Sequence, residues 1–137
     1  MIEIIAVILL ISIVSAVIAA RISDTAIYDL SSQVEVVKTH LRYAQIRAMD
    51  TNTPWGINFT SPTSYYLFEG AGSETPVILP GEDAATVNLT TKDSDLVITT
   101  PPGRITFDTF GSPGTTTITI PTNGGTITVT RNTGFIP

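Results

Sequence analysis

The sequence predicts an α+β fold in which one long N-terminal helix packs by its second half on an antiparallel β-sheet domain. The first twenty residues are almost entirely apolar, the next thirty carry apolar residues at helical spacing, and from Asn52 onward apolar and polar residues alternate. We therefore expect a hydrophobic transmembrane helix at 1–21, an amphipathic helix half at 22–50 and a β-sheet globular domain at 51–137.

The first segment has the length and composition of a membrane span. At about 1.5 Å per helical residue, Ile2 to Ala20 covers about 28 Å, which is close to the hydrocarbon thickness of a bilayer. A secretory signal peptide fits less well, because the segment opens on Glu3 and its first positive charge, Arg21, comes after the apolar run. We expect this helix to cross a membrane.

Glu3 is the one charged residue in this apolar run. An ionised carboxylate in hydrocarbon is costly, so an intramembrane acid indicates a function with a specific partner. We expect that partner to be the free amino terminus of a neighbouring chain. The alternative is a carboxylate at the headgroup level of a plain single-span anchor.

The second segment has one apolar face. It contains no Gly or Pro, and its apolar residues recur at alternating spacings of three and four, as on one side of a helix. This stripe consists of Ile27, Leu30, Val34, Val37, Leu41, Ala44 and Ala48. The opposite positions, Arg42 and Gln45 among them, suit water or a neighbouring subunit. Ser23 and Asp24 could cap a separate helix, but without a breaker we expect one continuous helix of about 45 residues.

Beyond Asn52 the period of two predicts strands. We expect them at 55–60, 65–69, 77–79, 96–99, 104–108, 115–120 and 126–130, with a weaker candidate at 85–89. Asn123-Gly-Gly125 is a strong hairpin signal between the last two.

The last hairpin has an apolar face and a threonine face. The apolar face consists of Ile118, Ile120, Ile127 and Val129. Since the stripe on the second helical segment is the only large apolar surface available to cover this face, we expect the helix to lie across the sheet.

The sequence offers little chemistry. Cysteine is absent, which excludes disulfides and thiolate metal sites. His40 is the only histidine and has charged helical neighbours, so we expect a surface side chain. Asp93 and Asp95 are weak calcium candidates, for which solvated turn acids are the better interpretation. No histidine lies near a serine in sequence and there is no glycine-rich phosphate loop, so we expect no enzyme, metal or cofactor.

The N-terminal residues carry a family resemblance. Met1-Ile2-Glu3-Ile4-Ile5 before an apolar helix resembles the start of mature type IV pilins and of type II secretion pseudopilins. In that family a peptidase removes a leader, the new amino terminus is N-methylated, and the glutamate is the fifth residue. Here it is the third, so either two residues precede Met1 or processing differs. The family's helix commonly contains Gly and Pro, whereas this one has Ser12 and Ser15.

The later segments resemble one subgroup of that family, the GspH and FimT-like subunits. Ala44 and Ala48 match an Ala-x-x-x-Ala pattern that precedes the first strand and lets it approach the helix closely. The segment 105–114 resembles a Phe-containing strand with a Gly turn, and 131–137 resembles a terminal Gly-hydrophobic strand that completes the sheet.

The resemblance implies a pilin-like fold and a structural subunit of a type IV pilus-like filament. Such subunits form a homo-polymer of identical chains, with the helix at 1–21 in the filament core and Met1 and Glu3 as the assembly residues. Before assembly the subunit is inserted in the membrane and meets prepilin peptidase and the inner-membrane assembly machinery. It is expected in the bacterial inner membrane and then in an extracellular or periplasmic filament. The alternative is a low-abundance GspH/FimT-like pseudopilin that initiates or tips the filament. Some FimT-like subunits bind DNA through a basic C-terminal stretch, but with Arg131 alone there and a net charge of −5, nucleic acid is not an expected partner.

Overall fold

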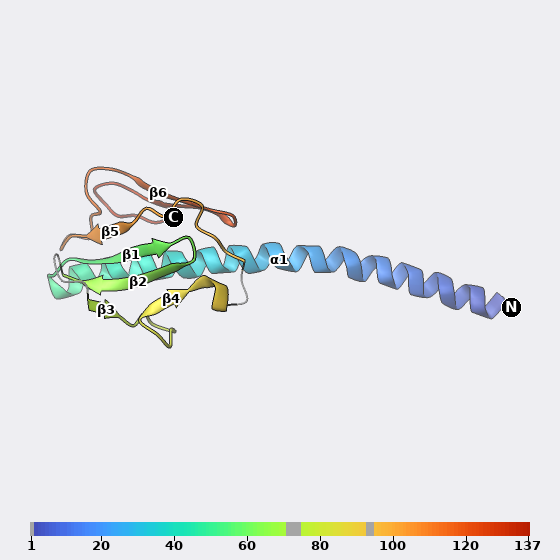
Figure 1. Cartoon of the computed structure of the whole chain (residues 1–137). Coiled ribbons are helices and arrows are strands. Elements are labelled where there is room, and N and C mark those ends of the chain that lie inside the picture. The colour runs from blue at the N-terminus through green and yellow to red at the C-terminus, as the bar shows by residue number, and fades with distance from the viewer. Residues whose placement is uncertain (1, 71–74, 93–94) are drawn as a thin grey trace.

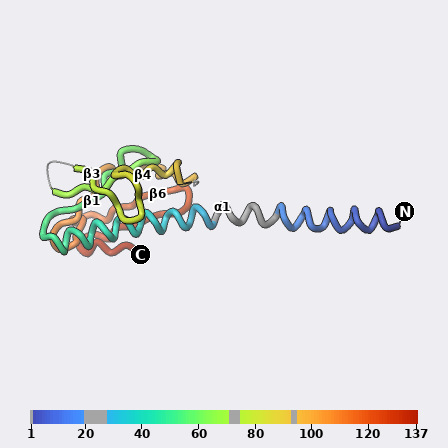
Figure 2. Tube along the Cα trace, turned by 90° about the horizontal axis from the view of Figure 1, so that it is seen from below, coloured from blue at the N-terminus to red at the C-terminus, as the bar shows by residue number. Residues whose placement is uncertain are grey.

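The computed structural model describes residues 2–70, 75–92 and 95–137, with the backbone alone at 20–27. It confirms the predicted α+β class, because one N-terminal helix is followed by antiparallel strands. Figure 1 shows the strands gathered along the second half of the helix, while the first half projects beyond them as a bare rod. Figure 2 shows the same separation after a quarter turn.

The helix α1 (Ile2–Thr51) runs without a break for 50 residues, which is about 75 Å at about 1.5 Å per residue. It contains no Gly or Pro to interrupt it. It ends where Asn52 adopts a left-handed φ of 53°, a conformation that asparagine tolerates just after a helix, and Pro54 then prevents continuation.

The main sheet is antiparallel and has the order β3-β2-β1-β5, with β4 also paired to β2. β3 and β4 share one edge of β2, since β3 pairs with Leu67–Glu69 and β4 with Ser64–Tyr66. The strands are β1 (Trp55–Ser61), β2 (Ser64–Glu69), β3 (Thr75–Val77), β4 (Thr86–Asn88) and β5 (Arg104–Phe107). A short 3₁₀ helix, η1 (Leu89–Thr91), follows β4.

The last two strands, β6 (Ile118–Thr122) and β7 (Gly125–Val129), form the hairpin that Asn123-Gly-Gly125 predicts. They make a second sheet of their own. The turn packs directly on α1, because a Cβ on Gly124 would lie 3.1 Å from the carbonyl oxygen of Leu30 and 3.1 Å from Cγ2 of Val34. A glycine is therefore needed here for close approach to the helix.

The strand predicted at 96–99 is wrong. Leu96 and Ile98 are buried as the alternation indicates, yet in the described part of this segment the ladder is a single bridge between Ile98 and Thr122. The reason is that Pro121, next to Thr122, has no N–H to donate to this segment. Its carbonyl oxygen accepts from the Thr99 N–H at 2.9 Å, but the return bond of a ladder cannot form. The backbone thus buries a strand-like face without extending the sheet.

The terminal strand expected within 131–137 is also wrong, because residues 131–137 form a turn and irregular backbone. Gly134 has a φ of 65°, and its N–H donates to the Thr130 carbonyl at 2.8 Å. A Cβ on Gly134 would lie 2.1 Å from the Gly111 carbonyl oxygen. The terminal glycine therefore closes a turn against a neighbouring loop.

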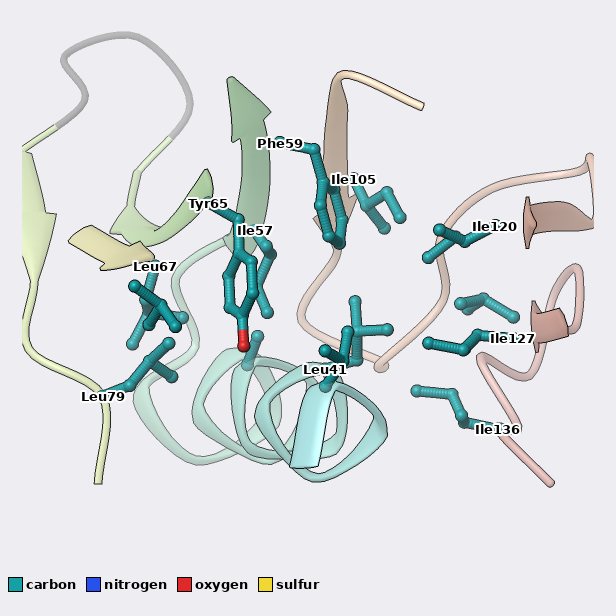
Figure 3. Packing of buried hydrophobic residues seen from close by; sticks show 14 of the residues in the cluster. Leu41, Ile57, Phe59, Tyr65, Leu67, Leu79, Ile105, Ile120, Ile127 and Ile136 are labelled. Carbon is teal, nitrogen blue, oxygen red and sulfur yellow. The ribbon is translucent and has the colours of Figure 1, made fainter. Parts of the chain in front are cut away.

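The hydrophobic core lies between α1 and the two sheets. Figure 3 shows Leu41 of the helix facing Ile57, Ile105 and Ile120 across this layer. All four are buried, so the second half of the helix covers the sheets as expected.

Candidate functional site

The first half of α1 is a continuous exposed apolar surface. The window Ile2–Ala19 has a mean hydropathy of 2.9, none of it is buried against the domain, and by length and composition it could cross a membrane. Side chains such as Ile8 and Leu10 are 61% and 66% exposed. Such a patch is far larger than a soluble monomer leaves open, so it calls for cover by lipid or by another protein.

Glu3 lies in the first turn of this surface and its side chain is exposed. Met1, the other predicted assembly residue, lies outside the described residues. Ser12 is the nearest polar residue along the helix, and its Oγ donates to the carbonyl oxygens of Ile8 at 2.5 Å and Leu9 at 3.1 Å. Its hydroxyl is therefore satisfied within the helix, whereas the carboxylate of Glu3 projects from an apolar rod.

The predicted packing stripe lies where α1 meets the sheets. Leu30 is half-buried and packs against the core, and the side chain of Ile27 lies outside the described residues. The remaining members are buried, with exposed fractions of 6% or less: Val34, Val37, Leu41, Ala44 and Ala48.

Two polar helix residues that the helical pattern directs to water or to a neighbouring subunit instead donate to backbone carbonyl groups of the sheet domain, so that interpretation is wrong. Gln45 Nε2 donates to the carbonyl oxygens of Gly111 at 2.9 Å and Thr133 at 3.0 Å. Arg42 Nη2 donates to the carbonyl oxygen of Ile136 at 3.1 Å. Each bond joins residues more than sixty positions apart, which a helical pattern cannot reveal.

The expected surface position of His40 is also wrong, because the residue is only 5% exposed. Its Nδ1 lies 2.8 Å from the Tyr65 hydroxyl oxygen, and its Nε2 lies 4.0 Å from Oε1 of Glu82. Glu82 Oε2 in turn pairs with Lys92 Nζ at 2.8 Å. Helical periodicity places His40 beside charged residues of α1, but it carries no information on the loop after β3, which brings Glu82 to this position.

The calcium candidates receive no support. Asp93 lies outside the described residues, while Asp95 is exposed and its carbonyl oxygen accepts from Asn123 Nδ2 at 2.7 Å. In the part of the chain that the structure describes, no three His, Asp or Glu side chains are placed to share a metal ion. A solvated acid remains the interpretation for Asp95.

Comparison with known proteins gives one match. The protein-family model described as type II transport protein GspH matches residues 33–134, a range that starts in the second half of α1 and includes every strand. Searches of curated proteins and of solved structures found no match. The exposed apolar half of α1 lies outside the matched range.

Proposed function

Since the chain belongs to the GspH family of type II transport proteins, we propose that it is a subunit of a pilus-like filament that assembles through the first half of α1. As a member of that family it is a type II secretion pseudopilin, and the family is structural rather than enzymatic. The observation that carries the proposal is the bare apolar rod at 2–19, attached to a folded domain that leaves it uncovered.

The rod would exchange one apolar environment for another. Before assembly it lies in the inner membrane, where lipid covers its side chains; in the filament, the rods of identical subunits cover one another. Because both environments bury the same apolar surface, burial alone gives little preference between them. A specific polar contact is therefore needed to fix register.

Glu3 supplies this contact in the proposal. Its carboxylate pairs with the N-terminal amine of a neighbouring subunit, so that two charges that are costly in an apolar core neutralise each other. Processing by prepilin peptidase would provide that amine, and the inner-membrane machinery of type II secretion would deliver the subunit to a periplasmic filament.

The family match also favours a second candidate, a low-abundance subunit that initiates or tips the filament. The two candidates differ in stoichiometry. Native filaments should be purified and their subunits quantified by mass spectrometry; we expect this chain to be the dominant subunit. A few copies per filament would support the second candidate, and absence from the filament would contradict both.

DNA binding is not expected of this chain. Arg131 is an isolated exposed base in the C-terminal segment, and the net charge is −5, which repels a phosphate backbone. In a gel-shift assay, the full chain in detergent micelles should not retard duplex DNA even at low salt. Retardation that weakens as salt is added would contradict this expectation.

A further inference from the structure

Four large apolar side chains are exposed at the end of the domain where α1 stops. We define them as the distal patch: Ile46, Met49, Phe110 and Phe135, with exposed fractions of 57%, 47%, 86% and 63%. Ile46 and Met49 lie about one turn apart on α1, while Phe110 follows β5 and Phe135 lies in the C-terminal segment. Phenylalanine and methionine are enriched in protein–protein interfaces, so this surface indicates a docking site.

Two loops bring the phenylalanines of the distal patch to α1. Gln45 Nε2 donates to the carbonyl oxygens of Gly111 at 2.9 Å and Thr133 at 3.0 Å, so both loops are fastened at the same helical turn. A Cβ on Gly111 would lie 2.9 Å from Sδ of Met49. Each phenylalanine lies within two residues of one of these contacts, so the patch gathers on one side of α1.

The backbone at both phenylalanines is fixed by hydrogen bonds. Asp108 Oδ1 accepts from the N–H groups of Phe110 and Ser112, each at 2.9 Å. The Phe135 carbonyl oxygen accepts from the Thr130 N–H at 2.9 Å. The two rings are therefore presented to solvent by ordered turns, and docking has little backbone entropy to remove there.

The polar group between the two loops has its protons satisfied inside the subunit. Both protons of Gln45 Nε2 are used by the carbonyl oxygens of Gly111 and Thr133. A partner that excludes water from this surface therefore leaves no amide proton of Gln45 unpaired, which would be costly. The distal patch suits an apolar partner.

The rod at 2–19 of a second copy has this chemistry. From Ile4 to Ala20 the sequence carries no charged side chain, and none of the rod is buried against its own domain. Figure 1 shows the start of α1 and its C-terminal end at opposite ends of the molecule. Because α1 is one unbroken helix, the rod cannot reach the distal patch of its own subunit, and the rod that covers it must come from another copy.

We propose that the distal patch is the docking site for the rod of a second copy of this chain. The inference rests on the proposed filament and names the surface of the domain that receives each rod. Contact between unlike surfaces at opposite ends of a molecule is head-to-tail, and it continues from copy to copy into a filament when the rotation does not close a ring. A rod that meets the patch near Leu10 shifts the two copies by about 60 Å along α1, since Leu10 and Met49 lie that far apart at about 1.5 Å per residue.

Cross-linking tests this contact directly, because the chain contains no cysteine and introduced cysteines are its only thiols. Met49→Cys is combined with a second cysteine at each position from 4 to 19 in turn, and a short, membrane-permeant thiol cross-linker is added to cells that assemble the chain. We expect a ladder of cross-linked copies on a denaturing gel. The yield should rise at every third or fourth rod position, as on one face of a helix.

The control series carries Ile78→Cys in place of Met49→Cys. Ile78 is 57% exposed and follows β3, which lies at the opposite edge of the main sheet from β5. A cysteine there is as accessible as one in the distal patch, but it lies away from the proposed path of the rod. This series should give no ladder.

Truncation of the distal patch gives an independent measurement. Phe110→Ser combined with Phe135→Ser should lower the ratio of filament-bound to membrane-bound subunit by about tenfold or more, because aromatic anchors carry much of the binding energy of an interface. Leucine at both positions should retain most of the incorporation, and Ile78→Ser should assemble like the unaltered chain. Fluorescence of the single Trp55, which is buried, verifies that each variant is folded.

The outcomes separate the docking from the filament. Filaments without a ladder specific to Met49→Cys, or with full incorporation of the double serine variant, overturn the docking and leave the proposed function intact. A ladder specific to Met49→Cys in cells that form no filament supports the docking and overturns the filament. Absence of both the ladder and the filament overturns both.

Discussion

Replacing Glu3 with alanine is expected to lower incorporation of the subunit into filaments by about tenfold or more, because it would remove one member of the proposed ion pair and leave the neighbour's amine uncompensated. The substitution should not disturb the fold, since Glu3 lies in the exposed first turn of α1, far from the sheets. It should also leave membrane insertion intact or improve it, because the segment 2–20 would then carry no charged side chain. The measurement is the ratio of filament-bound to membrane-bound subunit in cells.

Ser12→Ala is the matched control for Glu3→Ala. It removes another polar side chain from the same rod, but the Ser12 hydroxyl donates to carbonyl oxygens of its own helix, those of Ile8 at 2.5 Å and Leu9 at 3.1 Å. Incorporation should therefore remain near that of the unaltered chain. If Glu3→Ala assembles as well as Ser12→Ala, Glu3 has no part in filament formation, and the rod packs by apolar contact alone.

The parts of the fold that the sequence predicts are those that depend on local sequence pattern. The 3.6 period, the change to a period of two and the Asn-Gly-Gly turn each depend on neighbours in sequence, so α1, β1, β2 and the final hairpin follow from them. The strand expected at 96–99 failed for a non-local reason. Its inward face is buried, but whether a ladder extends depends on the partner strand, and Pro121 of that partner cannot donate.

The candidate sites also divide into those that local sequence reveals and those that depend on tertiary contacts. The apolar rod and Glu3 are visible in sequence because hydropathy and an isolated charge need no tertiary information. The contacts of His40 could not be predicted, since His40, Tyr65 and Glu82 are far apart in the chain and only the tertiary fold brings them together. The one local sign was a lone histidine near the apolar stripe, next to Leu41. That sign is equally compatible with a surface position.

Replacing Leu41 with alanine is expected to lower the free energy of unfolding of the domain by about 2–5 kcal/mol, the usual cost of a cavity at a fully buried leucine. Leu41 is 0% exposed and belongs to the core between the helix and the sheets. The loss can be measured by denaturant unfolding of the full chain in detergent micelles. Fluorescence of Trp55 is a suitable signal, since this single tryptophan begins β1 and is buried.

Ile46→Ala is the matched control for Leu41→Ala. Ile46 is on the same stretch of α1 but is 57% exposed, so its truncation should change the free energy of unfolding by no more than about 0.5 kcal/mol. Equal losses in the two variants would mean that the helix does not cover the sheets through the stripe that contains Leu41. A large loss in Leu41→Ala alone, with Glu3→Ala as stable as the unaltered chain, would separate the two halves of α1 into a half that folds the domain and a half left free for assembly.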